Sequence, residues 1–138
     1  MNAVEKKLLF IVNPRAGKTK SRAPLFDAVS IFSKAGYLVR VAETRRHGDA
    51  TELAERFGGD FDLVVCHGGD GTLNETVNGI MRLPREKRPP LSYLPGGSTN
   101  DFASSMHLSR NLLQAARDIV EGEPRTLDLG SFNGRCFS

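Results

Sequence analysis

An apolar run meets a helix-start pattern in Val64-Val-Cys-His-Gly-Gly-Asp-Gly-Thr-Leu-Asn-Glu75, with paired glycines, one acid and a further glycine between them. Gly68, Gly69 and Gly71 have no side chain, so the backbone there can come within hydrogen-bonding distance of a phosphate. The helix that follows points its free N–H groups and the positive end of its dipole toward the same place. The stretch therefore predicts an anion site at the end of a strand, with a nucleotide phosphate as the leading candidate.

Apolar runs and amphipathic segments alternate along the rest of the chain. Short apolar runs closed by turn residues are typical of strands covered on both faces, and they lie at residues 8–12, 37–41, 61–66 and 91–94. Helical patterns lie at residues 24–35, 49–57, 72–81, 98–105 and 109–121. This alternation predicts βαβ units. The expected fold is α/β, with an open, mostly parallel, doubly wound, Rossmann-like sheet and helices on both faces.

Three turn-rich segments each follow a predicted strand. They are Asn13-Pro-Arg-Ala-Gly17, Gly68-Gly-Asp-Gly71 and Pro95-Gly-Gly-Ser98. Ligands in open parallel sheets bind outside the carboxyl ends of the strands, so the three segments are expected to gather at one edge. An acid between glycines would repel a bare phosphate. Asp70 is therefore expected to meet a metal ion, to orient a basic group or to hydrogen-bond a neighbouring loop.

Some of these segments also fit simpler interpretations. Thr72-Leu-Asn-Glu75 has the spacing of a capping box, and Asp49-Ala-Thr-Glu52 places an acid at a helix cap with a glutamate three residues on. On that interpretation these side chains only satisfy backbone donors. Ala16-Gly-Lys-Thr19 matches the end of a Walker A loop, but that motif needs a glycine where Val12 stands. A P-loop NTPase is therefore rejected.

The composition fits one globular domain with a core. The chain has 138 residues, is 39% hydrophobic and 25% charged, and carries a formal net charge of +3. This mild charge suits anionic ligands, and no nucleic-acid partner is predicted. Cys66 lies in an apolar run, so we expect a small buried hydrophobe rather than a disulfide framework. The apolar run Leu8–Val12 is too short for a signal sequence or a membrane span, which predicts a cytoplasmic protein, and peripheral contact with a membrane stays open.

Two further patterns are weighed against ordinary surface roles. His47 and His67 are not at metal-ligand spacing with any cysteine, so no zinc site is predicted. The loop from Arg82 to Pro90 is basic and contains prolines. Attraction to anionic lipid is one interpretation of its charge, and a solvated surface is the favoured one.

The three turn segments together carry a family resemblance. Asn13–Gly17, Gly68-Gly-Asp-Gly-Thr-Leu-Asn-Glu-Thr-Val-Asn-Gly-Ile80 and Pro95-Gly-Gly-Ser-Thr-Asn-Asp-Phe-Ala103 resemble, in order and spacing, the catalytic domain of diacylglycerol kinases. The wider group includes bacterial lipid kinases, sphingosine kinases and ceramide kinases. The likeness covers essentially the whole chain. Gly-Gly-Asp-Gly alone is shared with NAD kinases and phosphofructokinases, so the resemblance implies a sheet of that type.

The resemblance implies the nucleotide-binding half of a kinase that transfers the γ-phosphoryl group of ATP to a lipid hydroxyl, such as that of diacylglycerol. ATP and Mg²⁺ would be the cofactors, and a nucleotide and a lipid would be the substrates. Asp70 would act through ATP-bound magnesium or by positioning the phosphates, and Glu75 would order the loop. Ser98 stands where the family more often has threonine and keeps a hydroxyl. The implied ATP-binding residues are Asn13, Pro14, Arg15, Ala16, Gly17, Thr44, Gly69, Asp70, Gly71, Thr72, Leu73, Asn74, Glu75 and Ser98.

The end of the chain alternates apolar and polar residues around Ser131–Gly134, like two strands of an antiparallel element. We predict a nucleotide-binding domain over residues 1–128 and the start of a truncated, β-rich second domain over residues 129–138. The resemblance implies that this second domain carries the catalytic base and a structural magnesium site. No base is therefore named, and this fragment alone is expected to be inactive. The strand at Phe132–Phe137 would leave an open edge through which two copies pair as a homo-oligomer.

Two other functions stay open. One is an NAD-kinase-like enzyme, against which Asn78-Gly79 and Asn100-Asp-Phe-Ala103 count. The other is a non-catalytic module that senses a nucleotide or docks on a membrane.

Overall fold

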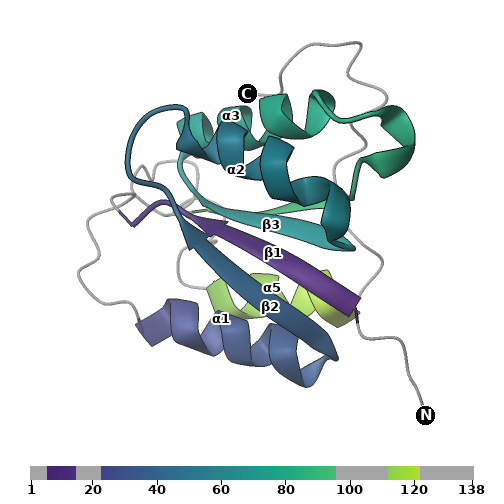
Figure 1. Ribbon diagram of the computed structural model, residues 1–138. Coiled ribbons are helices and arrows are strands. Elements are labelled where there is room, and N and C mark those ends of the chain that lie inside the picture. Colours follow the sequence, from purple (N-terminus) through teal and green to yellow (C-terminus); the bar gives the residue numbers. More distant parts are fainter. Residues whose placement is uncertain (1–5, 15–22, 96–111, 122–138) are drawn as a thin grey trace.

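A computed structural model describes residues 6–14, 23–95 and 112–121 of the chain (Figure 1). The described strands form one sheet of four in the order β2-β1-β3-β4. Their bounds are β1 (Lys6–Val12), β2 (Tyr37–Glu43), β3 (Leu63–Gly68) and β4 (Leu91–Pro95). Every neighbouring pair in this sheet runs parallel. The predicted parallel sheet is confirmed.

The described helices cover both faces of the sheet. They are α1 (Ala23–Lys34), α2 (Asp49–Phe57), α3 (Asp70–Met81) and α5 (Leu112–Glu121), with short 3-10 helices η1 (Gly58–Asp60) and η2 (Arg85–Lys87). Figure 1 shows α1 and α5 on one face and α2 and α3 on the other. The doubly wound α/β architecture is therefore confirmed. The helix predicted at 98–105, and the first three residues of the one predicted at 109–121, lie outside the described residues.

The central strand β1 supplies side chains to two apolar layers, because successive residues of a strand point to opposite faces. Leu9 and Ile11 belong to the layer beneath α2 and α3. Phe10 belongs to the layer beneath α1 and α5, where its ring meets that of Phe32 edge to face at 5.6 Å between centroids. Cys66 is buried and unpaired as expected, and burial raises the pKa of its thiol to about 12. It packs as a small hydrophobe.

The bounds of one strand and the start of one helix differ by two residues from the predicted ones. β3 covers residues 63–68 instead of 61–66, and α3 begins at residue 70 instead of 72. Phe61 instead closes η1, where its N–H donates to the carbonyl of Gly58 at 3.1 Å. The reason lies in the pairing, because β1 offers β3 partners from Leu8 to Val12 and these meet Leu63 to His67.

The capping box predicted for α2 is wrong. Its N-cap is Gly48, in the left-handed region at φ 92°, and no side chain in the described ranges caps the helix. The carboxylate of Asp49 instead reaches back and accepts hydrogen bonds from the N–H groups of Arg45 at 2.7 Å and Arg46 at 3.2 Å. Asp49 therefore orders the connection between β2 and α2 rather than the helix start.

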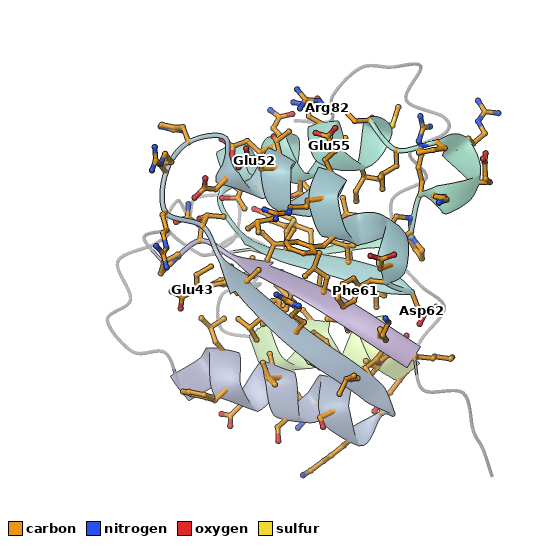
Figure 2. All side chains as sticks on the ribbon, viewed as in Figure 1. Glu43, Glu52, Glu55, Phe61, Asp62 and Arg82 are labelled. Atoms are coloured by element: carbon orange, nitrogen blue, oxygen red, sulfur yellow. The ribbon has the colours of Figure 1, made fainter. Side chains whose placement is uncertain are left out.

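Two basic residues after α3 have structural contacts. Arg88 donates from Nη2 to the carbonyl of Met81 at 2.9 Å and from Nε to that of Leu83 at 3.0 Å. Its guanidinium thus satisfies carbonyl groups at the end of α3. Arg82 pairs with Glu55 at 3.0 Å, and Figure 2 shows both side chains on the outer surface of α2 and α3. Two basic side chains of this segment therefore have structural partners, and the choice between a solvated surface and attraction to anionic lipid stays a prediction.

Candidate functional site

Backbone hydrogen bonds continue beyond the strands at the carboxyl edge of the sheet. Thr44 donates its N–H to the carbonyl of Val12 at 2.9 Å, and Asn13 donates its N–H to the carbonyl of His67 at 2.9 Å. The first residue after β2 is therefore held beside the end of β1, and the first residue after β1 is held beside the end of β3.

Of the three predicted turn segments, Asn13 and Pro14 of the first, all of Gly68–Gly71 and Pro95 of the third lie in the described part of the chain, and Pro95 pairs with Gly68 in the sheet. Residues 15–17 and 96–98 lie outside the described residues.

Helix α3 opens onto this edge. It begins at Asp70, directly after the extended Gly69 (φ −92°, ψ −169°), and no side chain caps it within the described residues. The first N–H groups of an α-helix lack intrahelical partners, and the helix dipole favours an anion beside them. Asp70 and Gly71 are exposed there. The capping box predicted from Thr72 and Glu75 is wrong, because the helix starts two residues before Thr72.

The glycines before and within this turn have different roles. A Cβ atom on Gly69 or Gly71 would meet no described atom within 4 Å, so packing does not require glycine at either position. A Cβ atom on Gly68 would lie 2.8 Å from the Cβ of Thr72. Packing against Thr72 therefore requires glycine at position 68, whatever its relation to a phosphate. Gly69 and Gly71 remain candidates for the close approach of a phosphate.

Thr72 joins two segments that are far apart in the sequence. Its hydroxyl accepts a hydrogen bond from Nδ2 of Asn13 at 3.2 Å, across 59 positions. Its carbonyl accepts the hydroxyl of Thr76 at 2.8 Å. The residue after β1 is thus tied to the first turn of α3. Two predicted site residues are brought into contact in this way.

The next three predicted site residues lie differently. Leu73 is 3% exposed and packs into the core, so its side chain does not face the edge. Asn74 has a buried Oδ1 without a hydrogen-bond partner among the described residues. Glu75 places Oε2 3.7 Å from Nδ1 of His47, and its carbonyl accepts the hydroxyl of Thr51 at 2.8 Å. These contacts join the β2–α2 connection to α3. The role of Glu75 in ordering the glycine-rich loop stays a prediction.

The remaining predicted residues are placed only in part. Pro14 directly follows Asn13 and is half-buried, and Thr44 is buried. The other predictions, Arg15, Ala16, Gly17 and Ser98, lie outside the described residues. In the described ranges, no three side chains of His, Cys, Asp or Glu gather into a metal site. None of the described helices combines the length and the apolarity needed to cross a bilayer.

Two residues at this edge were missed by the sequence reasoning. Tyr93 donates its hydroxyl to the carbonyl of Gly68 at 2.8 Å, and burial raises its pKa. His67 has Nδ1 3.0 Å from the carbonyl of Leu94, so Nδ1 carries the proton of the neutral ring. Burial lowers the pKa of His67, and the bond to Leu94 opposes this change more weakly. The available signal was a polar side chain near the carboxyl end of an otherwise apolar strand.

The lowered pKa of His67 predicts a pH-dependent stability. Its folded-state value lies below the ordinary 6.5, so the unfolded chain takes up this proton first as the pH falls. The free energy of unfolding is therefore expected to fall as the pH drops below about 6.5 toward the folded-state pKa. Urea titrations at several pH values should show a steeper loss for the wild type than for His67→Asn.

Parallel pH profiles for wild type and His67→Asn would contradict the burial of a neutral imidazole at this edge.

The fold and this edge together define a class of protein, an open parallel α/β domain whose strand ends and helix start suit an anionic ligand. The family described as Diacylglycerol kinase catalytic domain matches residues 7–132. The chain belongs to that family. The predicted resemblance is thereby confirmed.

Relatives in two genera support this assignment. Curated diacylglycerol kinases of Staphylococcus aureus and Staphylococcus epidermidis are 39% and 40% identical over 135 residues, which cover 97% of this chain and 42% of each relative. The crystal structure of a diacylglycerol kinase from Bacillus anthracis superposes with a TM-score of 0.70 and 34% identity, covering 88% of this chain and 41% of that one. This chain therefore spans less than half the length of these relatives.

Proposed function

We propose that this chain is the nucleotide-binding half of a lipid kinase that transfers the γ-phosphoryl group of ATP to a lipid hydroxyl, such as that of diacylglycerol. The observation that carries the proposal is the first turn of α3. It is uncapped by any described side chain and lies at the carboxyl edge of the sheet. Membership of the diacylglycerol kinase catalytic domain family supports the reaction class.

The described residues suggest a division of roles. The N–H groups at the start of α3 bind phosphate oxygens, and the bare Gly69 and Gly71 let those oxygens approach. Asn13 lies beside this turn through its side-chain hydrogen bond to Thr72. Thr44 lies one strand further away, where its N–H donates to the carbonyl of Val12. Phosphoryl transfer depends mainly on positioning and on charge stabilisation. Backbone N–H donors held at the edge of the sheet would position the phosphates.

A magnesium ion would supply neutralising charge on the phosphates. Asp70 offers carboxylate oxygens, which are ligands that this ion prefers, and its exposed place at the start of α3 fits a contact with an ion carried by the nucleotide. A dedicated site of three or more acidic or histidine side chains is absent from the described ranges. The residues present therefore fit an ion that arrives with ATP.

Several finer assignments belong to the same proposal. Residues 1–128 form the nucleotide-binding domain and residues 129–138 begin a β-rich domain that supplies the general base. The protein is cytoplasmic and touches the membrane only peripherally, where its lipid substrate lies. Copies of the chain would pair through the strand predicted at residues 132–137, which lie outside the described part of the structure. The longer relatives, of which this chain spans 42%, leave room for such a second domain.

Calorimetric titration with ATP tests the nucleotide site. With magnesium present, we expect saturable binding to the wild type and its loss in Asp70→Ala. Without magnesium, Asp70→Ala should bind ATP at least as well as the wild type, because removal of the carboxylate removes a repulsion from the phosphates. Asp60→Ala is the control, since Asp60 is an exposed acid in η1, which precedes the amino end of β3, whereas the turn follows the carboxyl end of that strand.

Two results would contradict parts of this proposal. Equal affinity of wild type and Asp70→Ala with magnesium would exclude the role of Asp70. Absence of binding to the wild type at millimolar ATP would exclude a nucleotide site in this chain alone. Transfer of labelled phosphate by the longer protein to diacylglycerol, with sphingosine and NAD as competing acceptors, would separate the lipid kinase from an NAD-kinase-like enzyme.

A further inference from the structure

Two side chains cross between β3 and β4 in opposite directions at the carboxyl edge. Tyr93 of β4 donates its hydroxyl to the carbonyl of Gly68 in β3 at 2.8 Å. His67 of β3 places Nδ1 3.0 Å from the carbonyl of Leu94 in β4. In the register of the sheet, His67 lies opposite Leu94 and Gly68 lies opposite Pro95. The two bonds therefore fasten the last residues of both strands, from which their loops depart.

Gly68 connects these bonds to the first turn of α3. Thr72 packs against Gly68, and the next residue, Gly69, is the N-cap of the helix. Thr72 also accepts a hydrogen bond from Asn13, whose own N–H donates to the carbonyl of His67. A displacement of Gly68 would therefore disturb both the helix start and the residue after β1.

Both donors keep their protons near neutral pH. Burial raises the pKa of Tyr93, so its hydroxyl stays protonated, and burial lowers the pKa of His67, so its ring stays neutral with a single N–H. Bonds between neutral groups are not weakened by salt in the way that exposed ion pairs are. Both hydrogen bonds are therefore expected to persist near neutral pH and at different salt concentrations.

We propose that Tyr93 and His67 are positioning residues that hold the turn Gly69–Thr72 ready for the phosphate oxygens of the nucleotide. This inference rests on the proposed function and extends it to two residues that need not touch the ligand. A turn already in its binding geometry loses less conformational freedom when the ligand arrives, which strengthens binding. Because the turn would contact phosphates rather than the base, the effect should be the same for ATP and for inorganic tripolyphosphate.

The first test compares Tyr93→Phe with a matched control, Tyr37→Phe. Tyr37 begins β2 at the amino end of the sheet, and its hydroxyl makes no hydrogen bond among the described residues. Loss of one hydrogen bond of ordinary strength predicts about three- to tenfold weaker binding of both ATP and inorganic tripolyphosphate to Tyr93→Phe. Tyr37→Phe should bind both ligands like the wild type. His67→Phe removes the opposite bond and is expected to behave like Tyr93→Phe.

The second test is amide hydrogen exchange in the nucleotide-free protein, followed by NMR. The N–H of Leu73 donates to the carbonyl of Gly69 at 3.1 Å and so reports on the turn. The N–H of Val64 donates to the carbonyl of Pro90 at 3.0 Å, at the other end of the same pair of strands. We expect faster exchange at Leu73 in Tyr93→Phe and an unchanged rate at Val64.

The outcomes separate the positioning role from other roles. Weaker binding with an unchanged rate at Leu73 would mean that Tyr93 contacts the ligand, and equal acceleration at Leu73 and Val64 would mean that its bond only stabilises the fold. Either result overturns the inference, as does unchanged affinity. If the wild type binds neither ligand, the proposed function fails for this chain. The exchange rates then still show whether Tyr93 holds the turn.

Discussion

A Gly71→Val variant is expected to keep its fold and to lose saturable ATP binding. Gly71 is the second residue of α3, it is exposed, and a Cβ atom there would meet no described atom within 4 Å. Valine is no worse than glycine in a helix, so the fold should tolerate it. Its branched side chain would nevertheless occupy the space beside the first N–H groups that a phosphate needs. Circular dichroism and calorimetric titration of the same samples would measure both properties.

The control for this substitution is Gly59→Val. Gly59 is an exposed glycine in η1, and a Cβ atom there would come no closer than 3.8 Å to Leu83 and Lys87, an ordinary contact. This variant should bind ATP like the wild type. Wild-type affinity in a folded Gly71→Val protein would place the nucleotide somewhere other than the first turn of α3.

A Gly79→Ala variant is expected to be markedly less stable. A Cβ atom at Gly79 would collide with the backbone oxygen of Thr51 and would lie 2.7 Å from the Cβ of Ala54, so α2 and α3 would have to move apart. Overpacking of this kind costs about 1–3 kcal/mol. It outweighs the gain of up to about 1 kcal/mol that alanine offers over glycine in a helix. Urea unfolding would give the change in the free energy of unfolding.

Gly71→Ala is the matched control, because it makes the same change in the same helix at a position with open space. It should be as stable as the wild type or slightly more stable. If Gly79→Ala were equally stable, the close crossing of α2 and α3 would be wrong. A second readout is ATP binding, since separation of the helices would strain the bond between Thr51 and Glu75 that joins them near the edge.

Much of the fold could be predicted because its signals are local. Apolar runs and helical stripes located all the described strands and α-helices, and Gly36, at φ 104° just after α1, has the left-handed conformation that is typical of a helix end. The boundaries were less predictable, as β3 shows. Its last residues, His67 and Gly68, have no sequence pattern that is typical of a strand. They belong to β3 because they pair with residues of the neighbouring strands β1 and β4.

The capping boxes failed for a related reason. Thr72 and Asp49 have the right spacing, but each makes a longer-range or backward contact, Thr72 with Asn13 and Asp49 with the N–H of Arg45. A spacing rule describes only the competition within one helix turn. It takes no account of a hydrogen-bond partner that the tertiary structure brings close from another segment of the chain.

The sequence by itself determined the order of strands and helices, the edge at which the turns gather and the family to which the chain belongs, because periodicity and glycine spacing act over short distances. Only the tertiary structure decided which bare glycine serves packing, with Gly68 against Thr72, and which remain open for a ligand. It also decided that Tyr93 reaches Gly68 across 25 positions and Asn13 reaches Thr72 across 59. Such contacts depend on where whole elements lie in the packed molecule, and no local pattern encodes that.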